Sequence, residues 1–320
     1  MKLLVTGANG FVGRALCKHN STRSADQVVA AVRKPDDSLD GIAQKIVGNI
    51  DSQTSWREAL EGVDAVVHLA GRAHVMHDTH VDPLSAYREI NTEGTINLAR
   101  QAASMGVKRF VYLSSIKVCG EGQLRVNEAA YTEDQPAKPI DPYAVSKHEA
   151  ELGLFEIAQH TNLKVTILRP PLVYGPGVRA NFLRLMQTVD RRWPLPLGGI
   201  VNRRDLIYLG NLVDAIAVCA SHPAAANRTF LLADGESLST PELIRRLGSA
   251  LGRPARLFSV PESWLRFAGA LTGKSMAVQR LLGSLMLDSS AIRAALGWQP
   301  PYSNEEGLAA TANWFRQQRQ

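Results

Sequence analysis

Short apolar runs alternate with longer amphipathic segments through the first two-thirds of the 320-residue sequence. The short runs are rich in Val, Ile and Leu, whereas the longer segments have the spacing of helices with one buried face. Because the short runs are apolar at successive positions, they are typical of parallel strands that helices cover on both faces. The pattern predicts strands over residues 2–6, 27–32, 45–47, 65–69, 109–114 and 164–169.

Strands separated by crossover helices predict an α/β protein with a Rossmann-like, doubly wound parallel sheet. Beyond Arg169, frequent prolines divide the chain into shorter helices and loops, which favours a smaller C-terminal substrate-binding lobe. We therefore expect a Rossmann domain over residues 1–168, joined by a returning segment at 205–222, and a lobe built mainly from residues 169–320. Within the lobe, Ser239 and Asp288 stand where helix N-caps are expected.

Composition narrows the class of protein further. The net charge is +6 and the pI about 9.3, but basic and acidic residues are interspersed, which favours an ordinary enzyme over a nucleic-acid-binding protein. Cys17, Cys119 and Cys219 lie too far apart for a Cys-x-x-Cys or zinc motif, as expected in a reducing compartment. We expect no signal peptide, because residues 1–5 run straight into a glycine-rich turn, and no apolar stretch reaches about 18 residues. We expect a cytoplasmic protein that binds neither membranes nor nucleic acid.

A glycine-rich turn follows the first predicted strand and leads into a helix. Its three glycines are spaced Gly-x-x-Gly-x-x-Gly, which permits a tight turn and a close approach of backbone to a pyrophosphate. The phosphates are then expected on free N–H groups at the positive end of the helix dipole. The candidate cofactor-binding residues of this turn are Gly7, Asn9, Gly10, Phe11, Val12 and Gly13.

The end of the second strand bears on the choice between NAD and NADP. This strand ends in Arg33 and Lys34, and the first carboxylate is Asp36. Two cations at this place suit the 2′-phosphate of NADP, whereas NAD is usually held there by an acidic residue. NADP is therefore slightly favoured over NAD, and a solvated Arg-Lys pair before a proline turn remains the alternative.

Tyr143 and Lys147 are spaced i to i+4 at the start of a predicted helix, which places the phenol and the ammonium on one face. Tyrosine has a reference pKa near 10, so it is a poor base at neutral pH unless a nearby cation stabilises the phenolate. The spacing alone is common in helices. It becomes specific when it is combined with Ser114 and Ser115 at the end of the fifth predicted strand, about thirty residues upstream.

With these residues the sequence resembles the extended short-chain dehydrogenase/reductase family, and within it the nucleotide-sugar epimerases and 4-ketoreductases. The resemblance covers nearly the whole chain. Its further motifs are His68-Leu69-Ala70-Gly71, Asn91-Thr92-Glu93-Gly94-Thr95, Arg169-Pro170-Pro171-Leu172-Val173-Tyr174-Gly175-Pro176, Arg204-Asp205-Leu206-Ile207-Tyr208 and Leu296-Gly297-Trp298.

The resemblance implies roles for individual residues. Ser115 would hydrogen-bond the reacting oxygen, Tyr143 would exchange its proton, and Lys147 would hold the nicotinamide ribose and lower the pKa of the tyrosine. Arg204 matches the position that binds the substrate diphosphate. Further substrate candidates are Arg280, Asn181 and His74, and Arg280 stands without the usual Arg-x-Gly-Asp motif. Further cofactor candidates are Asn49, Ile50, Leu69, Ala70, Gly71, Asn91, Pro170 and Val173.

Two features argue against other chemistries. Nucleotide-sugar 4,6-dehydratases of the resembled family carry Asp-Glu directly after the catalytic hydroxyl residue, where this chain has Ile116 and Lys117, so a dehydratase is disfavoured. A second feature is a cluster of possible metal ligands. These do not follow the i, i+4 helical zinc pattern, and we expect no metal. The clustered residues are His74, His77, Asp78 and His80.

The leading hypothesis is an NAD(P)-dependent 4-ketoreductase that reduces C4 of a UDP-linked 2-acetamido-dideoxy hexose for surface polysaccharide. The alternative is a 4-epimerase of UDP-glucose or UDP-N-acetylglucosamine with tightly bound NAD, which needs the same three residues. The cationic end of the second strand favours the reductase. A non-catalytic NADP-sensing protein is a remote third possibility, and retention of Ser115, Tyr143 and Lys147 argues against it. The resemblance also implies a homodimer.

Overall fold

A computed structural model of the chain describes residues 1–21, 27–73, 82–120 and 128–318. Its strands are β1 (Lys2–Thr6), β2 (Gln27–Val32), β3 (Ala43–Ile46), β4 (Ala65–His68), β5 (Arg109–Leu113), β6 (Lys164–Arg169), β7 (Leu172–Tyr174), β8 (Leu206–Tyr208) and β9 (Arg228–Leu231). Its α-helices are α1 (Phe11–Ser21), α2 (Pro83–Tyr87), α3 (Gly94–Ser104), α4 (Pro142–His160), α5 (Ala180–Asp190), α6 (Leu209–Ser221), α7 (Thr240–Ala250), α8 (Glu262–Leu271), α9 (Ser275–Leu282), α10 (Ser290–Leu296) and α11 (Asn304–Gln317). Shorter helical segments are η1 (Asp37–Leu39), η2 (Arg88–Glu93, a π-helix), η3 (Ile116–Val118) and η4 (Pro223–Ala225).

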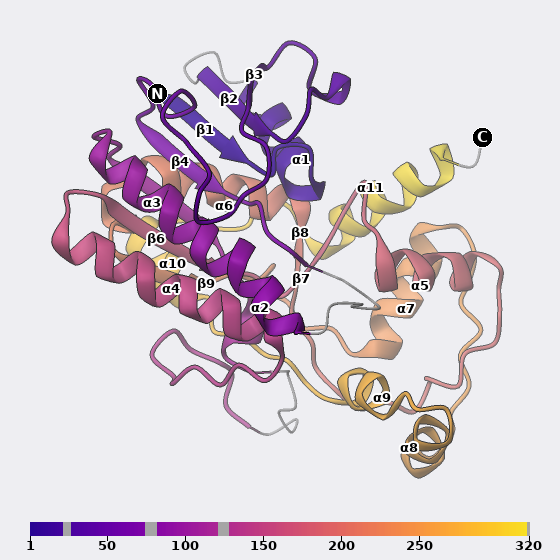
Figure 1. Cartoon of the computed structure of the whole chain (residues 1–320). Helices are drawn as coiled ribbons and strands as arrows, with labels where there is room; N and C mark the ends of the chain where they lie inside the picture. Colours follow the sequence, from indigo (N-terminus) through magenta and orange to yellow (C-terminus); the bar gives the residue numbers. More distant parts are fainter. Residues whose placement is uncertain (22–26, 74–81, 121–127, 319–320) are drawn as a thin grey trace.

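One parallel sheet of seven strands forms the body of the protein, in the order β3-β2-β1-β4-β5-β6-β9 (Figure 1). Side chains from α3 and α4 cover one face, and side chains from α1, α6 and α10 cover the other. The chain order reverses between β1 and β4, so a crevice is expected at the carboxyl ends of these strands, where doubly wound sheets bind ligands. The predicted Rossmann-like α/β fold is confirmed.

The apolar runs predicted the bounds of six strands to within two residues. The predicted strands at 2–6, 27–32 and 164–169 match β1, β2 and β6, and those at 65–69 and 109–114 are each one residue too long. The strand predicted at 45–47 is β3, which spans Ala43–Ile46 and lies at the sheet edge with mostly exposed side chains, so its apolar signal is weak. Three short strands were missed. These are β7, β8 and β9, of which β9 completes the main sheet and the other two form a separate parallel pair.

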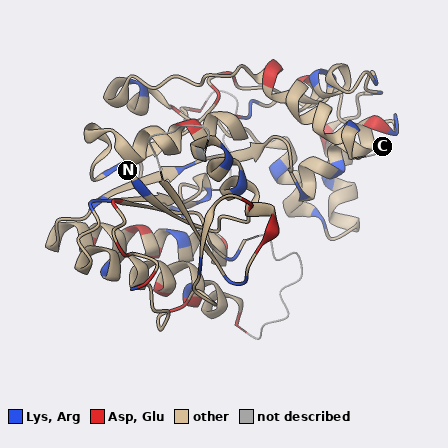
Figure 2. Cartoon of the chain, turned by 90° about the horizontal axis from the view of Figure 1, so that it is seen from above, with Lys and Arg blue, Asp and Glu red and all other residues tan. Residues whose placement is uncertain are grey.

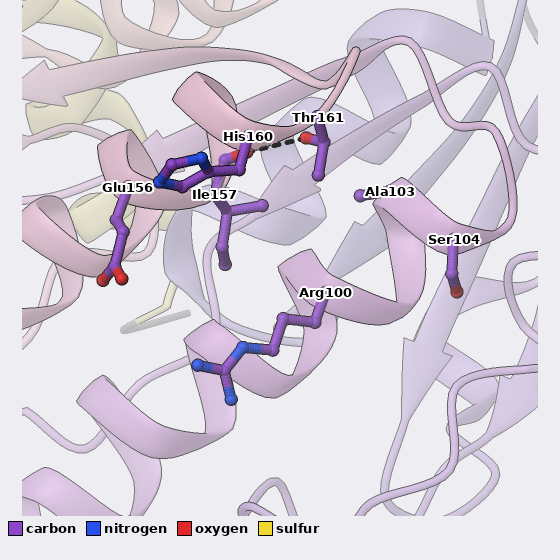
Figure 3. Close-up of a pocket in the computed structure, with 7 residues that line it drawn as sticks. All are labelled: Arg100, Ala103, Ser104, Glu156, Ile157, His160 and Thr161. Carbon is purple, nitrogen blue, oxygen red and sulfur yellow. Dashed lines mark hydrogen bonds between the residues drawn. The ribbon is translucent and has the colours of Figure 1, made fainter.

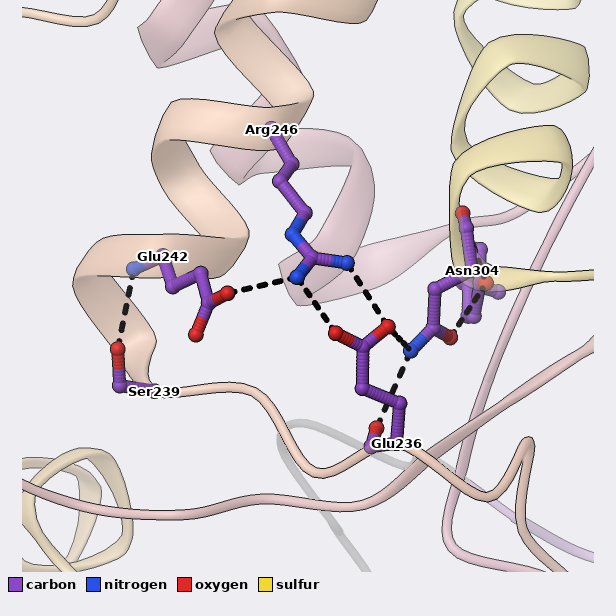
Figure 4. Close-up of polar contacts among 6 residues, drawn as sticks. Glu236, Ser239, Glu242, Arg246 and Asn304 are labelled. Atoms are coloured by element: carbon purple, nitrogen blue, oxygen red, sulfur yellow. Dashed lines mark hydrogen bonds and ion pairs between the residues drawn. The ribbon is translucent and has the colours of Figure 1, made fainter.

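The C-terminal lobe has an apolar core of its own, made by β7, β8, α5, α7 and α11. The predicted cap of α7 is present, since Ser239 Oγ accepts a hydrogen bond from the Glu242 nitrogen. The cap predicted at Asp288 is displaced by one residue: Ser289 is the N-cap of α10 and makes no side-chain cap bond, while Asp288 accepts the Ser290 nitrogen in the turn before the helix. A polar network also ties α7 to α11 (Figure 4). In it Arg246 binds the carboxylates of Glu236 and Glu242, and the amide of Asn304 donates to Glu236.

Half-buried Asp234 connects this lobe to the end of the sheet. Its carboxylate accepts hydrogen bonds from the Tyr208 nitrogen, the Asn211 amide and the Tyr174 hydroxyl. Burial raises the pKa of Asp234 to about 6, although these hydrogen bonds oppose the rise. A single carboxylate therefore joins β7, β8 and α6.

Charged residues of both signs are interspersed around the ribbon (Figure 2). None of the helices in the described residues is both long and apolar enough to span a bilayer. Within the same residues no group of His, Cys, Asp and Glu side chains is placed to hold a metal ion. The clustered candidates His74, His77, Asp78 and His80 lie outside the described residues.

Candidate active site

The glycine-rich turn joins β1 to α1 with backbone geometry that side chains would block. Gly7 has a φ of 64°, in the left-handed region, and a Cβ there would lie 2.8 Å from the Ala70 nitrogen. A Cβ on Gly13 would lie 2.1 Å from the Gly7 carbonyl oxygen. The Gly10 nitrogen donates to the same oxygen at 2.9 Å and closes the turn. The three predicted glycines are thus required by the local packing of backbone on backbone.

This turn meets the requirements of a dinucleotide pyrophosphate. α1 begins at Phe11 and has no acidic residue in its first turn, so its first N–H groups are available to an anion without a competing carboxylate. Asn9 and Val12 flank this start. Gly71 has no space for a side chain, because a Cβ there would lie 2.9 Å from Asn91 Oδ1 and 3.4 Å from Lys147 Nζ. We call the backbone surface formed by Gly7, Gly10, Gly13 and Gly71 the cradle. It lies at the carboxyl ends of β1 and β4, and these four residues place no side-chain atoms on it.

A fully buried histidine fixes the edge of this cradle. His68 Nδ1 lies 2.7 Å from Thr6 Oγ1, and its Nε2 lies 2.9 Å from Thr95 Oγ1. The Thr95 hydroxyl donates to the Asn91 carbonyl, so it can only accept from His68 Nε2–H. Burial lowers the pKa of His68 to about 3, so the ring is neutral and Nδ1 accepts from Thr6.

The same threonine holds the segment that follows β4. Thr6 Oγ1 accepts hydrogen bonds from the backbone nitrogens of Leu69 and Ala70, each at 3.2 Å. Both residues were predicted as cofactor contacts, and the structure places them directly against Gly7. The Thr6–His68–Thr95 chain therefore couples the floor of the cradle to β1, β4 and α3.

The end of β2 differs from its expected role. Arg33 and Lys34 are both exposed. Asp36 is half-buried, and the pKa of its carboxyl is lowered by hydrogen bonds with Ser38 and also by one with Asn9, a residue of the glycine turn. A carboxylate thus lies beside the turn, where NAD-binding proteins place an acidic group for the ribose hydroxyls.

Two further cofactor candidates lie in the loop after β3. The Asn49 carbonyl accepts the Thr54 hydroxyl at 2.7 Å, which orders the loop. Ile50 packs against the start of α3, since a Cβ on Gly94 would lie 2.8 Å from Ile50 Cγ2. The backbone of both residues is therefore held in place by contacts within the chain.

Asn91 lies in the π-helix η2 and its side chain is buried and fully used. Its Oδ1 accepts the Arg72 nitrogen at 2.8 Å, and its Nδ2 donates to the Arg72 carbonyl and to Ser146 Oγ. The amide therefore fastens the segment after Gly71 to α4. π-helical turns occur often at functional sites, and here the turn aims a buried amide at the edge of the cradle.

Ser115, Tyr143 and Lys147 come together at the carboxyl end of β5. Asp141 caps α4 by accepting the Ala144 nitrogen at 2.7 Å, and Pro142 opens the helix, so Tyr143 stands in its first turn. A hydrogen bond links the side chains of Tyr143 and Ser115. Buried Lys147 donates from Nζ to the Leu113 carbonyl at 2.9 Å and lies 6.0 Å from the Tyr143 ring centroid.

The electrostatics of this group differ from the expectation that Lys147 lowers the pKa of the tyrosine. Burial raises the pKa of Tyr143 to about 12, Asp141 adds to the rise, and the hydrogen bond with Ser115 opposes it. Burial also lowers the pKa of Lys147 to about 8, against the attraction of Glu151. The Lys147 ammonium donates its hydrogen bond to the Leu113 carbonyl. Without a bound cofactor, Tyr143 therefore keeps its proton at neutral pH.

The residues after Ser115 carry no acid pair. Ile116 is buried in a small apolar cluster, and Lys117 forms an ion pair with Asp141 and lies 5.8 Å from the Tyr143 ring centroid. Asp141 thus caps the helix and neutralises a cation beside the phenol. Sequence reasoning did not single it out, although a carboxylate directly before a helix-opening proline is an N-cap signature.

Behind Lys147 lies a buried ion pair that the sequence analysis also missed. Glu151, one turn further along α4, binds Arg169 at 2.6 Å, and Arg169 also contacts Cys119 Sγ. Burial alone would raise the pKa of Glu151, but hydrogen bonds from His148 and Arg169 outweigh it and hold the carboxyl ionised.

Two cofactor candidates follow β6. The Pro170 carbonyl accepts the Ile116 nitrogen at 2.9 Å, and Val173 lies half-buried in β7. Both stand at the same edge of the sheet as Ser115.

Three of the predicted substrate residues lie in different parts of the lobe: Asn181 in α5, Arg204 just before β8 and Arg280 in α9. The half-buried guanidinium of Arg204 donates to the carbonyls of Arg280 and Gly283 at 2.7 and 2.8 Å. Burial lowers its pKa, and within the described residues no carboxylate pairs with it. Asn181 is exposed in the first turn of α5, next to Ala180 with a φ of 53°. His74 lies outside the described residues.

A glycine-turn cradle beside a Ser-Tyr-Lys group, on a doubly wound sheet, defines a dinucleotide-dependent enzyme of the short-chain dehydrogenase/reductase type. Residues 3–233 match the model of the NAD dependent epimerase/dehydratase family, and the chain belongs to that family. The predicted family and the prediction of an enzyme are confirmed.

Individual relatives extend this result. The chain is 46% identical over 316 residues to a UDP-glucose 4-epimerase of Vibrio cholerae, a match that covers 98% of this chain and 95% of that protein. It is 26% identical to a dTDP-glucose 4,6-dehydratase of Streptomyces venezuelae solved with NAD, with a TM-score of 0.76 and coverage of 100% and 98%. The UDP-glucose 4-epimerase of Thermotoga maritima shares the fold at 23% identity, with a TM-score of 0.78 and full coverage of both chains.

Proposed function

We propose that this protein is a UDP-hexose 4-epimerase that inverts C4 of UDP-glucose or a related UDP-sugar with bound NAD. The observation that carries the proposal is the grouping of Ser115, Tyr143 and Lys147 beside the glycine cradle. The relative at 46% identity, a UDP-glucose 4-epimerase, supports the epimerase over the 4-ketoreductase that we first favoured. That first preference depended on Arg33 and Lys34, which are exposed beside a half-buried Asp36.

The cofactor would be held by the chain's own backbone. The turn at Gly7, Gly10 and Gly13 and the start of α1 would bind the pyrophosphate, Asp36 would bind the adenosine ribose, and Lys147 would bind the nicotinamide ribose. When bound there, NAD supplies a reversible two-electron acceptor next to the sugar. Only one of the three Lys147 N–H donors is used within the described residues, which leaves donors for the ribose.

Tyr143 would move the proton. Its Oη would exchange a proton with O4 of the sugar. Ser115 Oγ would hydrogen-bond both oxygens and keep them close enough for the transfer. Two contacts of the Ser115 hydroxyl support this role: it accepts the Lys117 nitrogen and is hydrogen-bonded with Tyr143. To accept the O4 proton while C4 is oxidised, Tyr143 would have to be a phenolate, and it would return that proton when C4 is reduced. Burial raises the pKa of Tyr143 to about 12 in the chain alone, so the positive charges of Lys147 and of the bound cofactor would be needed to stabilise the phenolate.

Arg204 would bind the diphosphate of the substrate. Among the residues that the structure describes, the hydrogen bonds of this half-buried guanidinium go to backbone carbonyls and to no carboxylate, which favours a dianionic ligand. The absence of an acid pair at Ile116 and Lys117 argues against loss of water during the reaction. The proposal therefore ends at an inverted C4 hydroxyl.

The decisive experiment supplies UDP-glucose or UDP-N-acetylglucosamine to the purified protein without any reductant. Anomeric proton NMR should show the C4 isomer growing to equilibrium, and the reaction should run from either isomer. Tyr143→Phe, which keeps the ring and removes the hydroxyl, should bind NAD and give no interconversion. Absence of isomerisation together with oxidation of NAD(P)H on a 4-keto sugar would establish the reductase instead.

The cofactor proposal has its own test. Denaturing the protein as purified should release NAD, which mass spectrometry distinguishes from NADP by the 2′-phosphate. Asp36→Ala should weaken NAD binding more than NADP binding. Release of NADP alone would contradict the assignment. A cytoplasmic location and a role in surface polysaccharide remain predictions from the sequence.

We also propose that the protein is a homodimer that pairs through α3 and α4. Leu152 on α4 is 57% exposed, and a groove of about 380 Å³ lies between the ends of the two helices (Figure 3). Leu152→Glu should convert the dimer to a monomer in sedimentation velocity, whereas Ile46→Glu, at a site on β3 that is 63% exposed, should not. The residues that line the groove are Arg100, Ala103, Ser104, Glu156, Ile157, His160 and Thr161.

A further inference from the structure

Helices α8 and α9 form a hairpin at the far end of the lobe, the lower right of Figure 1. The two helices pack closely, since a Cβ on Gly269 would lie 2.7 Å from Val278 Cγ2. Gly269 is the one buried residue of α8, so nearly the whole surface of this helix faces solvent. The hairpin thus presents α8 outward.

The exposed face of α8 is apolar. Trp264, Phe267 and Leu271 are 70%, 63% and 72% exposed, and their spacing of three and four residues places them on one side of the helix. Phe258 before the hairpin and Met276 in α9 are each about half exposed. Large aromatic and aliphatic side chains clustered on a surface mark a site of interaction.

The hairpin, together with the residues that lead into it from Arg253, holds most of the excess positive charge of the protein. Residues 253–283 contain five basic residues and one acidic residue, Glu262, which gives +4 of the total of +6. Glu262 is itself bound to Arg266 on α8. The basic residues are Arg253, Arg256, Arg266, Lys274 and Arg280.

We propose that the α8–α9 hairpin docks the protein reversibly on an anionic phospholipid surface. Trp264, Phe267 and Leu271 would enter the boundary between headgroups and acyl chains, and the surrounding cations would lie at the lipid phosphates. Aromatic and aliphatic side chains on one face of a helix, together with lysine and arginine, are typical of helices that lie in the plane of a membrane surface. This proposal revises the sequence-based expectation of no membrane partner.

Charge separates this occupant from a second copy of the chain. A symmetric contact between two hairpins would bring two surfaces of charge +2 together, with Arg253 and Arg256 of each chain close by in sequence, which opposes association. An anionic bilayer attracts the same segment, with each cation near the surface contributing favourably. The charge of the hairpin is therefore complementary to lipid and not to itself.

Docking would also position the substrate site. Arg204 is hydrogen-bonded to the carbonyls of Arg280 and Gly283, at the end of α9. The hairpin and the guanidinium are thus mechanically connected. A docked hairpin would hold this part of the lobe close to the lipid surface without touching Tyr143 or the glycine turn.

The test is co-sedimentation of the full chain with vesicles of phosphatidylcholine containing about one-third phosphatidylglycerol. Binding should exceed that to pure phosphatidylcholine and should weaken as salt rises. The double variant Trp264→Ser/Phe267→Ser should lower the partition coefficient at least about tenfold. The control Trp193→Ser/Ile46→Ser, at positions 58% and 63% exposed elsewhere on the chain, should bind as the original protein does.

Three outcomes would overturn the proposal: no binding to either vesicle, equal losses in the two double variants, or self-association in solution that the hairpin variant alone abolishes. The last would assign the hairpin to a second copy. Turnover in vesicle-free solution should be the same in both double variants, so failure of membrane docking and failure of the epimerase proposal are separate results.

Discussion

Replacing His68 by glutamine should make the protein more resistant to mild acid. The neutral ring accepts a hydrogen bond from Thr6 at Nδ1 and donates one to Thr95 from Nε2. A glutamine amide offers an acceptor oxygen and an NH2 group with two donors, and it stays neutral at every pH. The substitution therefore keeps an acceptor for Thr6 and a donor for Thr95, and of the changes it makes only the loss of titration depends on pH.

The magnitude follows from the shift in pKa. The fold lowers the pKa of His68 from 6.5 to about 3, so its neutral form stabilises the protein fully above pH 6.5. That contribution is lost as the pH falls from 6.5 towards 3, at up to about 1.4 kcal/mol per pH unit. Between pH 7.5 and 4.5 the original protein should therefore lose about 3 kcal/mol more than His68→Gln.

Denaturant unfolding of both proteins at pH 7.5, 6.5, 5.5 and 4.5 measures this difference directly. Loss of ring packing on Tyr112 lowers the stability of the variant by the same amount at every pH, so only the change in the gap is informative. Carboxylates titrate equally in both proteins and cancel. A gap that stays constant to within about 0.5 kcal/mol would refute the neutral, doubly bonded His68.

Three other predictions test the cradle and the site. Gly7→Ala should unfold the protein more easily and abolish NAD binding, whereas Gly41→Ala, with a φ of 74° and open space around it, should cost only about 1 kcal/mol by thermal unfolding. Arg204→Met should raise KM for the UDP-sugar at least about tenfold with little change in kcat, and Arg203→Met, an exposed neighbour, should not. Because burial lowers the pKa of Lys147 to about 8, kcat/KM should fall above that pH as the ammonium loses its proton, and a plateau to pH 10 would contradict its role.

Much of the fold could be predicted because buried parallel strands are apolar on both faces and stand out from amphipathic helices. β3 is an edge strand with exposed side chains, and so its boundaries were shifted. β9, with the sequence Arg-Thr-Phe-Leu, is too short and too polar at its start to stand out, and only its pairing with β6 makes it part of the sheet.

The site was predictable where chemistry depends on spacing along one element, and less so where it depends on contacts across the fold. The glycine turn and the i to i+4 pair of Tyr143 and Lys147 are local patterns. The partners of Asp141, Glu151 and Arg169 come from different elements, so sequence could not reveal that two ion pairs flank the catalytic group. The direction of the Tyr143 pKa likewise follows from burial.

The π-helix η2 determines the direction in which the side chains of the following helix point, up to the end of α3. A π-turn contains one residue more than an α-turn, and each residue advances an α-helix by about 100°. Shortening this segment by one residue would therefore swing Asn91 out of line with the Arg72 backbone and with Ser146. The additional residue rotates the helix that follows it. One continuous helical segment can therefore contact the cradle at its start and pack against the sheet at its end.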